Sequence, residues 1–220
     1  MGIFQLDAYV LILSGKDRWT FLDGLSTNKV DQSCTTVLTT TQAKIIDVID
    51  VIEVGENIAI LGHGPFKEDV LRHLQPRILQ QDVNIRDISS LNYVYVSTEQ
   101  FPETKDLTIT QSFLGWLIVA PKSMPLDPTM NQQEFDDYRI QNLIPFQQKE
   151  INHTVHPFNC GLAQYVHEAK GCFIGQELLT RMRSRGKMGK QLMIVDKNAD
   201  DATTIGTECS LAIRRTALRD

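Results

Sequence analysis

Cysteine, long apolar runs and excess positive charge are all scarce in this sequence of 220 residues. The four cysteines (Cys34, Cys160, Cys172 and Cys209) are far apart and form no Cys-x-x-Cys pair, so free thiols in a reducing compartment are expected rather than a disulfide framework. No apolar run approaches the ~20 residues that a membrane-spanning helix requires. The first six residues lack the basic and apolar regions of a secretory signal. These absences predict a cytoplasmic protein that does not enter a membrane.

The net charge of −5 argues against binding of nucleic acid through a broadly basic surface. There is one local exception, because the stretch between Glu177 and Asp196 holds no acid and five cations: Arg181, Arg183, Arg185, Lys187 and Lys190. Such a run could bind a polyglutamate tail, a nucleic-acid backbone or an acidic partner. The alternative, which the sequence favours, is a set of cations that complete a helix C-terminus and a solvated face.

The order of local patterns predicts an α+β fold with mixed or antiparallel sheets. Strands are expected at residues 9–13, 48–54, 58–61, 83–88, 93–97, 107–110 and 116–120, and helices after Asp17, after Gly64-Pro65 and at 131–142. Hairpins mixed with helices do not fit a doubly wound parallel sheet. A proline-containing stretch at 121–128 divides the chain into an α+β subdomain at residues 1–120 and a second subdomain at 121–192, with 193–220 left as a short third piece.

Residues 170–177, KGCFIGQE, are the most unusual string in the chain. Gly171 and Gly175 flank Cys172, and Lys170 lies two positions before the thiol. A helix is expected from residue 178, which would put Cys172 on a turn beside a cation and ahead of a helix N-terminus; both features lower the pKa of a thiol. The glycines would allow positive φ or close approach to a ligand. A tight turn with a buried, inert cysteine is an equally supported interpretation.

This string resembles the KGC-aromatic-x-GQE signature of the YgfZ branch of the folate-binding, aminomethyltransferase-like (GcvT-like) family. Weaker similarities follow in the family's order over residues 10–192. GKD at 15–17, FLDGL at 21–25 and Thr27-Asn28 resemble its G-x-D…F-L-x-G…T-N segment. TTQAKIID at 40–47 is similar to T-x-x-G-[RK]-I-x-D, and YRIQ at 138–141 with Ile144-Pro145 matches R-I-E-x-G-I-P imperfectly.

The resemblance implies a pseudo-symmetric body whose central hole admits tetrahydrofolate. It also implies a role in the assembly or maintenance of iron–sulfur proteins, including those that modify tRNA, with reduced folate and iron–sulfur proteins or their assembly machinery as partners. On the matched positions, Cys172 would be the functional thiol, accompanied by Lys170 and Asp47. The positions implied to contact the folate are Asp47, Arg139, Thr27, Asn28, Gly171, Phe173, Gly175, Gln176 and Glu177.

The chain departs from the family pattern at several places. Ala43 and Leu143 stand where the family has glycine, and Gln141 replaces its glutamate. Residues 193–220 are too short for the small β-barrel with which family members usually end, so compressed remnants of its strands are expected there.

Asp47 bears on the choice between family branches. The aminomethyltransferases carry an aspartate doublet here, whereas this chain has Asp47-Val48. A single carboxylate could bond a pterin or act as the base of a one-carbon transferase, but a solvated residue at a strand end is slightly favoured on composition. Arg139 could form a bidentate contact with a folate carboxylate; its alternative is a cation on a helix surface.

A metal-binding interaction module is the remaining alternative. His153, His156, Cys160, His167 and Cys172 place five potential ligands within 20 residues. Their spacing matches no standard zinc motif, so histidines that line a cleft are the favoured interpretation and no metal site is assigned.

Overall fold

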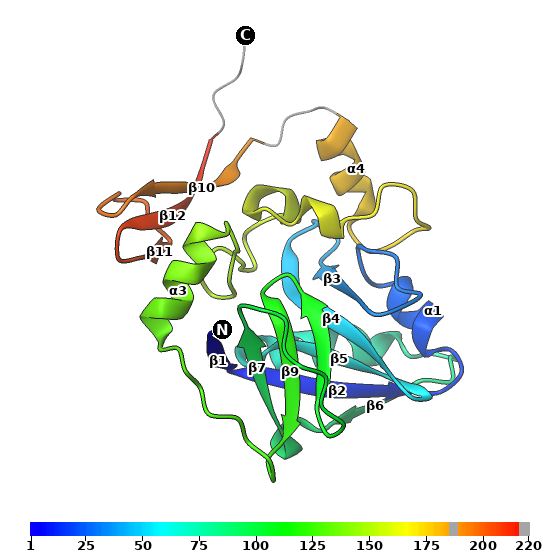
Figure 1. Ribbon diagram of the computed structural model, residues 1–220. Coiled ribbons are helices and arrows are strands. Elements are labelled where there is room, and N and C mark those ends of the chain that lie inside the picture. The colour runs from blue at the N-terminus through cyan, green and yellow to red at the C-terminus, as the bar shows by residue number, and fades with distance from the viewer. Residues whose placement is uncertain (185–188, 216–220) are drawn as a thin grey trace.

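The computed structural model describes residues 1–184 and 189–215, so Arg185 and Lys187 of the basic run lie outside the described residues. Two antiparallel sheets form the body (Figure 1). The larger has the order β3-β4-β5-β2-β6, with bounds Cys34–Thr39, Ile45–Val54, Asn57–His63, Ala8–Ser14 and Asn84–Asp87. The smaller has the order β1-β7-β9-β8, with bounds Ile3–Leu6, Asn92–Ser97, Gly115–Pro121 and Thr108–Ser112.

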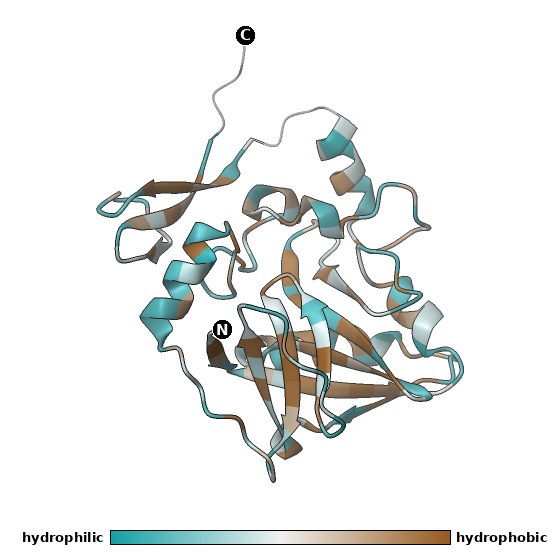
Figure 2. Cartoon of the chain, in the orientation of Figure 1, coloured by the Kyte–Doolittle hydropathy of each residue, from teal (hydrophilic) through white to brown (hydrophobic). Residues whose placement is uncertain are grey.

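Alternation of side chains along β2 gives the larger sheet two buried faces. Leu11 and Leu13 face helices α1 (Arg18–Asp23) and α2 (Lys67–Leu74), where they pack in one apolar cluster. Val10 points the other way and packs with Val94 and Leu117 of the smaller sheet. Many residues of both sheets are brown, that is hydrophobic, in Figure 2, and the candidate site lies between these sheets.

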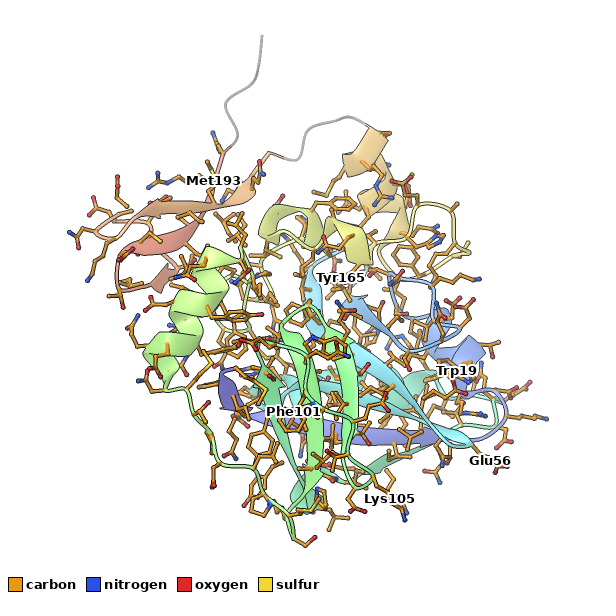
Figure 3. The ribbon with its side chains drawn as sticks, viewed as in Figure 1. Trp19, Glu56, Phe101, Lys105, Tyr165 and Met193 are labelled. Carbon is orange, nitrogen blue, oxygen red and sulfur yellow. The ribbon has the colours of Figure 1, made fainter. Side chains whose placement is uncertain are left out.

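Two further helices and a third sheet complete the chain. Helix α3 (Gln132–Gln141) begins at a capping box made by Asn131 and Glu134. Residues 170–177 are called the KGC segment below, and α4 (Gln176–Ser184) begins with its last two residues. The third sheet has the order β10-β12-β11, with bounds Gln191–Asp196, Cys209–Arg214 and Thr204–Ile205. Its Met193 is exposed (Figure 3). Short 3₁₀ turns η1 to η5 cover Gly64–Phe66, Gln75–Arg77, Ser89–Leu91, Pro157–Cys160 and Ala163–Tyr165.

The predicted α+β class with antiparallel sheets is confirmed. Helix α3 lies inside the expected range, and α2 ends two residues before Pro76, as the missing amide of proline requires. Asp17 precedes α1 as expected, but its carboxylate accepts from the amide of Asp82 at 2.8 Å instead of capping the helix. Strands β1 and β3 were not expected from the sequence. Across the described ranges, no helix has the length and apolar character to span a bilayer.

Candidate ligand-binding site

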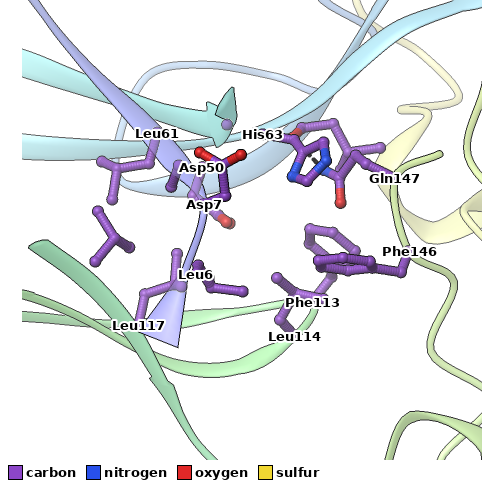
Figure 4. Close-up of a pocket in the computed structure, with 14 residues that line it drawn as sticks. Leu6, Asp7, Asp50, Leu61, His63, Phe113, Leu114, Leu117, Phe146 and Gln147 are labelled. Atoms are coloured by element: carbon purple, nitrogen blue, oxygen red, sulfur yellow. Dashed lines mark hydrogen bonds between the residues drawn. The ribbon is translucent and has the colours of Figure 1, made fainter. Parts of the chain in front are cut away.

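A cavity lies between the two large sheets, beside the β8–β9 hairpin (Figure 4). Its walls are mostly apolar and aromatic and include Leu61, Val94, Phe113, Leu114, Leu117 and Phe146. The volume of the cavity is only about 20 Å³. The cavity is therefore narrow, and a flat ring could enter only if the aromatic side chains moved apart.

Asp50 is the buried carboxylate of this cavity. It sits on β4, paired with Leu61 of β5 on one side and with Thr35 of β3 on the other. Its oxygens accept hydrogen bonds from the hydroxyls of Thr35 and Ser112, the latter at 2.7 Å. Burial raises the pKa of Asp50 to about 6, outweighing the opposite effect of the two hydrogen bonds. Asp50 is therefore mostly ionised at neutral pH, in a site with little water.

Two more residues of the cavity wall carry polar atoms without a partner. The Nε2 atom of His63 and the Oε1 atom of Gln147 are buried, and neither has a hydrogen-bond partner within residues 1–184 and 189–215. Burial lowers the pKa of His63, which favours its neutral form. Because buried polar groups are nearly always satisfied, unpaired atoms in a cavity wall indicate positions where a ligand or water bonds.

Asp47 lies behind the cavity and is wholly buried, so its interpretation as a solvated strand-end residue is wrong. Its oxygens accept from the Tyr9 hydroxyl at 2.9 Å, the His63 amide at 3.1 Å and the Gln147 side chain at 3.2 Å. Burial nevertheless raises the pKa of Asp47 to about 7. Gly62 permits this packing, since a Cβ there would come within 2.3 Å of both the Asp47 carboxylate and the Tyr9 hydroxyl. Asp47 thus supports the cavity wall through Gln147.

Lys170 of the KGC segment is directed at the loop after α1. Its ammonium donates to the carboxylate of Asp23 at 2.9 Å and to the backbone oxygens of Asp23, Ser26 and Asn28 at 2.6, 2.9 and 2.8 Å. The side chain is only 2% exposed, and burial lowers its pKa although Asp23 acts in the opposite direction. The structure therefore pairs this cation with the 23–28 loop; activation of Cys172 by Lys170 stays a prediction.

The rest of the segment packs against the turn before β4. Gly175 has φ +86°, and a Cβ there would lie 2.7 Å from the Thr40 oxygen, which confirms the need for glycine. Gly171 lacks a positive φ, and a Cβ there would meet nothing within 4 Å, so of the two expected reasons for glycine only close approach to a ligand stays a prediction at that position. Phe173 is buried below the Lys170 ammonium, 5.5 Å from ring centre to nitrogen.

The two polar residues that end the segment contact only nearby groups in the described part of the chain. Gln176 donates to the Lys170 oxygen at 3.4 Å, and Glu177 pairs with Arg181 on the exposed face of α4. Cys172 itself is exposed, so its interpretation as a buried, inert thiol is wrong. Helix α4 begins at Gln176, four positions after the cysteine.

Thr27 and Asn28 join distant parts of the chain. The Thr27 hydroxyl donates to the Tyr165 oxygen at 2.6 Å, and the backbone oxygen of Thr27 accepts from the His167 amide. Asn28 bonds β3 through its side-chain amide and the oxygen of Thr35. Both residues hold the 23–28 loop on β3 and on the segment before KGC; contact of either with a ligand stays a prediction.

Arg139 is completely buried, so its interpretation as a surface cation is wrong. Its guanidinium pairs with Asp136 and, at 3.3 Å, with Glu150, and it lies over the Phe146 ring at 5.0 Å. Glu150 in turn accepts from the hydroxyl of Thr204 at 2.7 Å. This network ties α3 to the third sheet, and Arg139 contacts Phe146 of the cavity wall without lining the cavity itself. Its contact with a folate carboxylate stays a prediction.

The proposed metal ligands have separate partners. His153 approaches Asp69 at 3.7 Å, His156 bonds the Ala43 oxygen and His167 accepts from the Ala169 amide. Cys160 is buried, which raises its pKa. Among the described residues, no three His, Cys, Asp or Glu side chains lie close enough to hold a metal ion. The described part of the basic run is also divided, because Arg183 lies over Phe158 while Arg181 and Lys190 are exposed.

Two antiparallel sheets packed around a cavity, with helices outside them, define the aminomethyltransferase fold. Aminomethyltransferase T of the glycine cleavage system from Bartonella henselae aligns with 97% of this chain and 78% of its own, at a TM-score of 0.76 and 12% sequence identity. No protein-family model matches the sequence, and no curated protein gives a significant match. The expected fold is therefore confirmed, and what the cavity binds has to be argued from its residues.

Sequence reasoning missed the four polar residues of the cavity wall, Asp7, Asp50, His63 and Gln147. One signal was present for Asp50, because this aspartate interrupts the apolar run at residues 48–54. A charge inside a strand that is otherwise buried on both faces is rarely tolerated without a specific partner. His63 and Gln147 carry no such signal.

Proposed function

We propose that this protein binds a reduced folate in the cavity between its two large sheets, with Asp50 as the residue that recognises the pterin. The observation that carries the proposal is a buried carboxylate in a cavity whose walls are otherwise mostly apolar and aromatic. A pterin presents two adjacent N–H donors on one edge and a flat ring. Paired donors suit the two oxygens of a carboxylate, and the flat ring can stack on Phe113 and Phe146 once these side chains of the wall move apart.

The cavity fits such a ligand in two further respects. Two atoms without a partner in the described ranges can bond the remaining polar atoms of the ring. The Nε2 atom of His63 can donate or accept, and the Oε1 atom of Gln147 can accept. The fold supports the same assignment, because it is that of an aminomethyltransferase and residues 170–177 resemble a signature of the folate-binding family.

Calorimetry with monoglutamyl tetrahydrofolate tests this proposal. Ala8 lines the cavity, so Ala8→Leu should fill part of it and abolish the heat of binding, whereas the matched change Ala169→Leu on an exposed loop should leave binding unchanged. Absence of binding to the unmodified protein, or equal binding to both variants, would remove the proposal.

We further propose that the folate-loaded protein serves iron–sulfur proteins, with Cys172 as its functional thiol. Two features support this role: the resemblance to the YgfZ branch, and the exposure of Cys172 on a segment anchored by Lys170 and Gly175. In cells that depend on the protein, Cys172→Ala should lower the activity of iron–sulfur enzymes without changing folate affinity. Normal iron–sulfur enzyme activity in the variant would contradict the role.

One-carbon transfer is the second candidate, because the fold is that of an aminomethyltransferase. Asp47, at the position implied for a base, is already bonded by Tyr9, His63 and Gln147 and is wholly buried, which disfavours direct attack on a ligand. Turnover of a methylene-carrying substrate that is lost in Asp47→Asn would establish this function. Turnover unaffected by that substitution would exclude Asp47 as the base.

A further inference from the structure

A second hollow lies on the outside of the larger sheet, between α2 and the turn that leads into β4. It is larger than the cavity, with a volume of about 320 Å³. Its floor is apolar and includes Ile45 and Ile46, while its rim carries Asp69, Arg72, Arg77 and His153. An apolar floor with a charged rim can hold the stem of a flexible ligand and pair with its charged groups.

The fixed charge of this groove is positive. Arg72 pairs with Asp69 on the same helix, which neutralises that carboxylate. Arg77 is half-buried, bonds the oxygen of His73 through one nitrogen, and has no acidic partner among the residues the structure describes. His73 is buried, which lowers its pKa to about 4 and leaves the ring neutral. The groove thus carries an unbalanced cation on a protein whose net charge is −5.

One aromatic ring contacts both the wall of the cavity and the wall of the groove. Phe66 packs edge-on against His63, which lines the cavity, with 5.6 Å between the ring centres. Phe66 also contacts His153, which lines the groove, with 5.0 Å between the ring centres. The two hollows are therefore neighbours across a single buried side chain.

We propose that this groove binds the carboxylates of an oligo-γ-glutamyl tail carried by the folate in the cavity. The inference rests on the proposed folate site and adds where the tail lies. Arg77 offers a planar fork that matches a carboxylate, and Arg72 can bond a second carboxylate through the nitrogens that do not pair with Asp69. A tail of linked carboxylates can occupy a groove that a single small anion would not fill. The basic run at Arg181 and Lys190 is the competing location for the same tail.

The test compares tetrahydrofolate carrying one and five γ-linked glutamates, with affinities measured by calorimetry. In the unmodified protein the pentaglutamate should bind about tenfold more tightly, since each exposed ion pair contributes modestly and several act together. In Arg72→Gln/Arg77→Gln this advantage should fall to about twofold or less, with monoglutamate affinity unchanged. Arg181→Gln/Lys190→Gln is a control with the same change of charge and should retain the full advantage.

Several outcomes overturn the inference while leaving the folate site intact. One is equal affinity of the two ligands for the unmodified protein; another is loss of the pentaglutamate advantage in the Arg181/Lys190 control instead. If monoglutamate does not bind at all, the proposed function fails, and free penta-γ-glutamate then tests the groove alone. If penta-γ-glutamate binds the unmodified protein but not Arg72→Gln/Arg77→Gln, the groove is supported as its binding site. If the peptide does not bind the unmodified protein, the inference is overturned. Equal competition by inorganic phosphate would identify a general anion site and contradict a tail-specific one.

Discussion

The ammonium of Lys170 is bonded to both the carboxylate and the backbone oxygen of Asp23, 147 positions earlier in the chain. This contact joins the two stretches that most resemble the folate-binding family, residues 21–28 and 170–177. A third stretch, at 40–47, meets the same segment where Gly175 packs against the Thr40 oxygen. Motifs separated by more than a hundred residues thus form one junction, in which the lysine has a structural role independent of any reaction.

We therefore predict that Lys170→Met lowers the free energy of unfolding by about 3 kcal/mol, because it leaves Asp23 and several backbone oxygens without their donor. Denaturation with urea measures this. Lys105→Met, at an exposed lysine, is the control and should change stability by less than about 0.5 kcal/mol. Equal free energies of unfolding for the two variants would show that the Lys170 contacts do not stabilise the protein.

Asp50 should make stability depend on pH. Its pKa in the folded protein is raised to about 6, so the folded state holds the proton more tightly than the unfolded chain does. Stability contributed by the protonated form is therefore lost as the pH rises from about 4 through about 6. Asp47, with a pKa raised to about 7, extends the same trend upward.

Asp50→Asn should remove the Asp50 share of this slope. The hydroxyls of Thr35 and Ser112 can rotate to satisfy an amide, so the variant should equal the unmodified protein near pH 4 and exceed it by up to about 3 kcal/mol at pH 8. Urea denaturation across this range gives the difference. A variant less stable than the unmodified protein at pH 8 would contradict the effect of burial on this carboxylate.

Leu143, two positions after the end of α3, has a backbone conformation that suits glycine. Its φ is +52°, and the amides of Leu143 and Ile144 bond the oxygens of Ile140 and Arg139, the two bonds of a Schellman motif. The side chain is 45% exposed, so little packing is lost when it is removed. We predict that Leu143→Gly stabilises the protein by about 1 kcal/mol. Leu143→Ala, which retains the Cβ, should not stabilise; thermal unfolding of the pair separates backbone strain from side-chain loss.

Cys172 should be the thiol that reacts first with a small alkylating reagent. It is the exposed one of the four cysteines, whereas Cys160 is buried and burial raises the pKa of Cys34 to about 11. At pH 7.5 mass spectrometry should find one fast modification, absent in Cys172→Ser. Fast labelling that persists in this variant would place the reactive thiol elsewhere.

The fold was largely predictable because it follows from local patterns. Alternating apolar residues in β2, the Gly55 loop between β4 and β5, and the capping box before α3 each act over a few residues. The strand β1 was missed because it is only four residues long, and its pairing with β7 joins residues more than 85 positions apart. Pairing at that distance leaves no trace in a local pattern.

The site was less predictable, for a related reason. Arg139 and Lys170 were expected to face a ligand or a thiol, because a cation in a motif suggests an open charge. The structure instead pairs each with a carboxylate, Glu150 and Asp23, neither of which the sequence marks as its partner. The cavity itself is assembled from both sheets and from Phe146 and Gln147, so its composition depends on tertiary packing alone.

Affinity for monoglutamyl tetrahydrofolate, measured for the unmodified protein, Asp50→Asn and Cys172→Ala, tests the central claim most directly. We predict that the unmodified protein and Cys172→Ala bind equally well, while Asp50→Asn loses about tenfold or more in affinity because a charged acceptor is replaced. That loss would occur in a variant at least as stable as the unmodified protein, so misfolding could not explain it. Undiminished binding by Asp50→Asn would contradict a folate site between the two sheets that is built on this carboxylate.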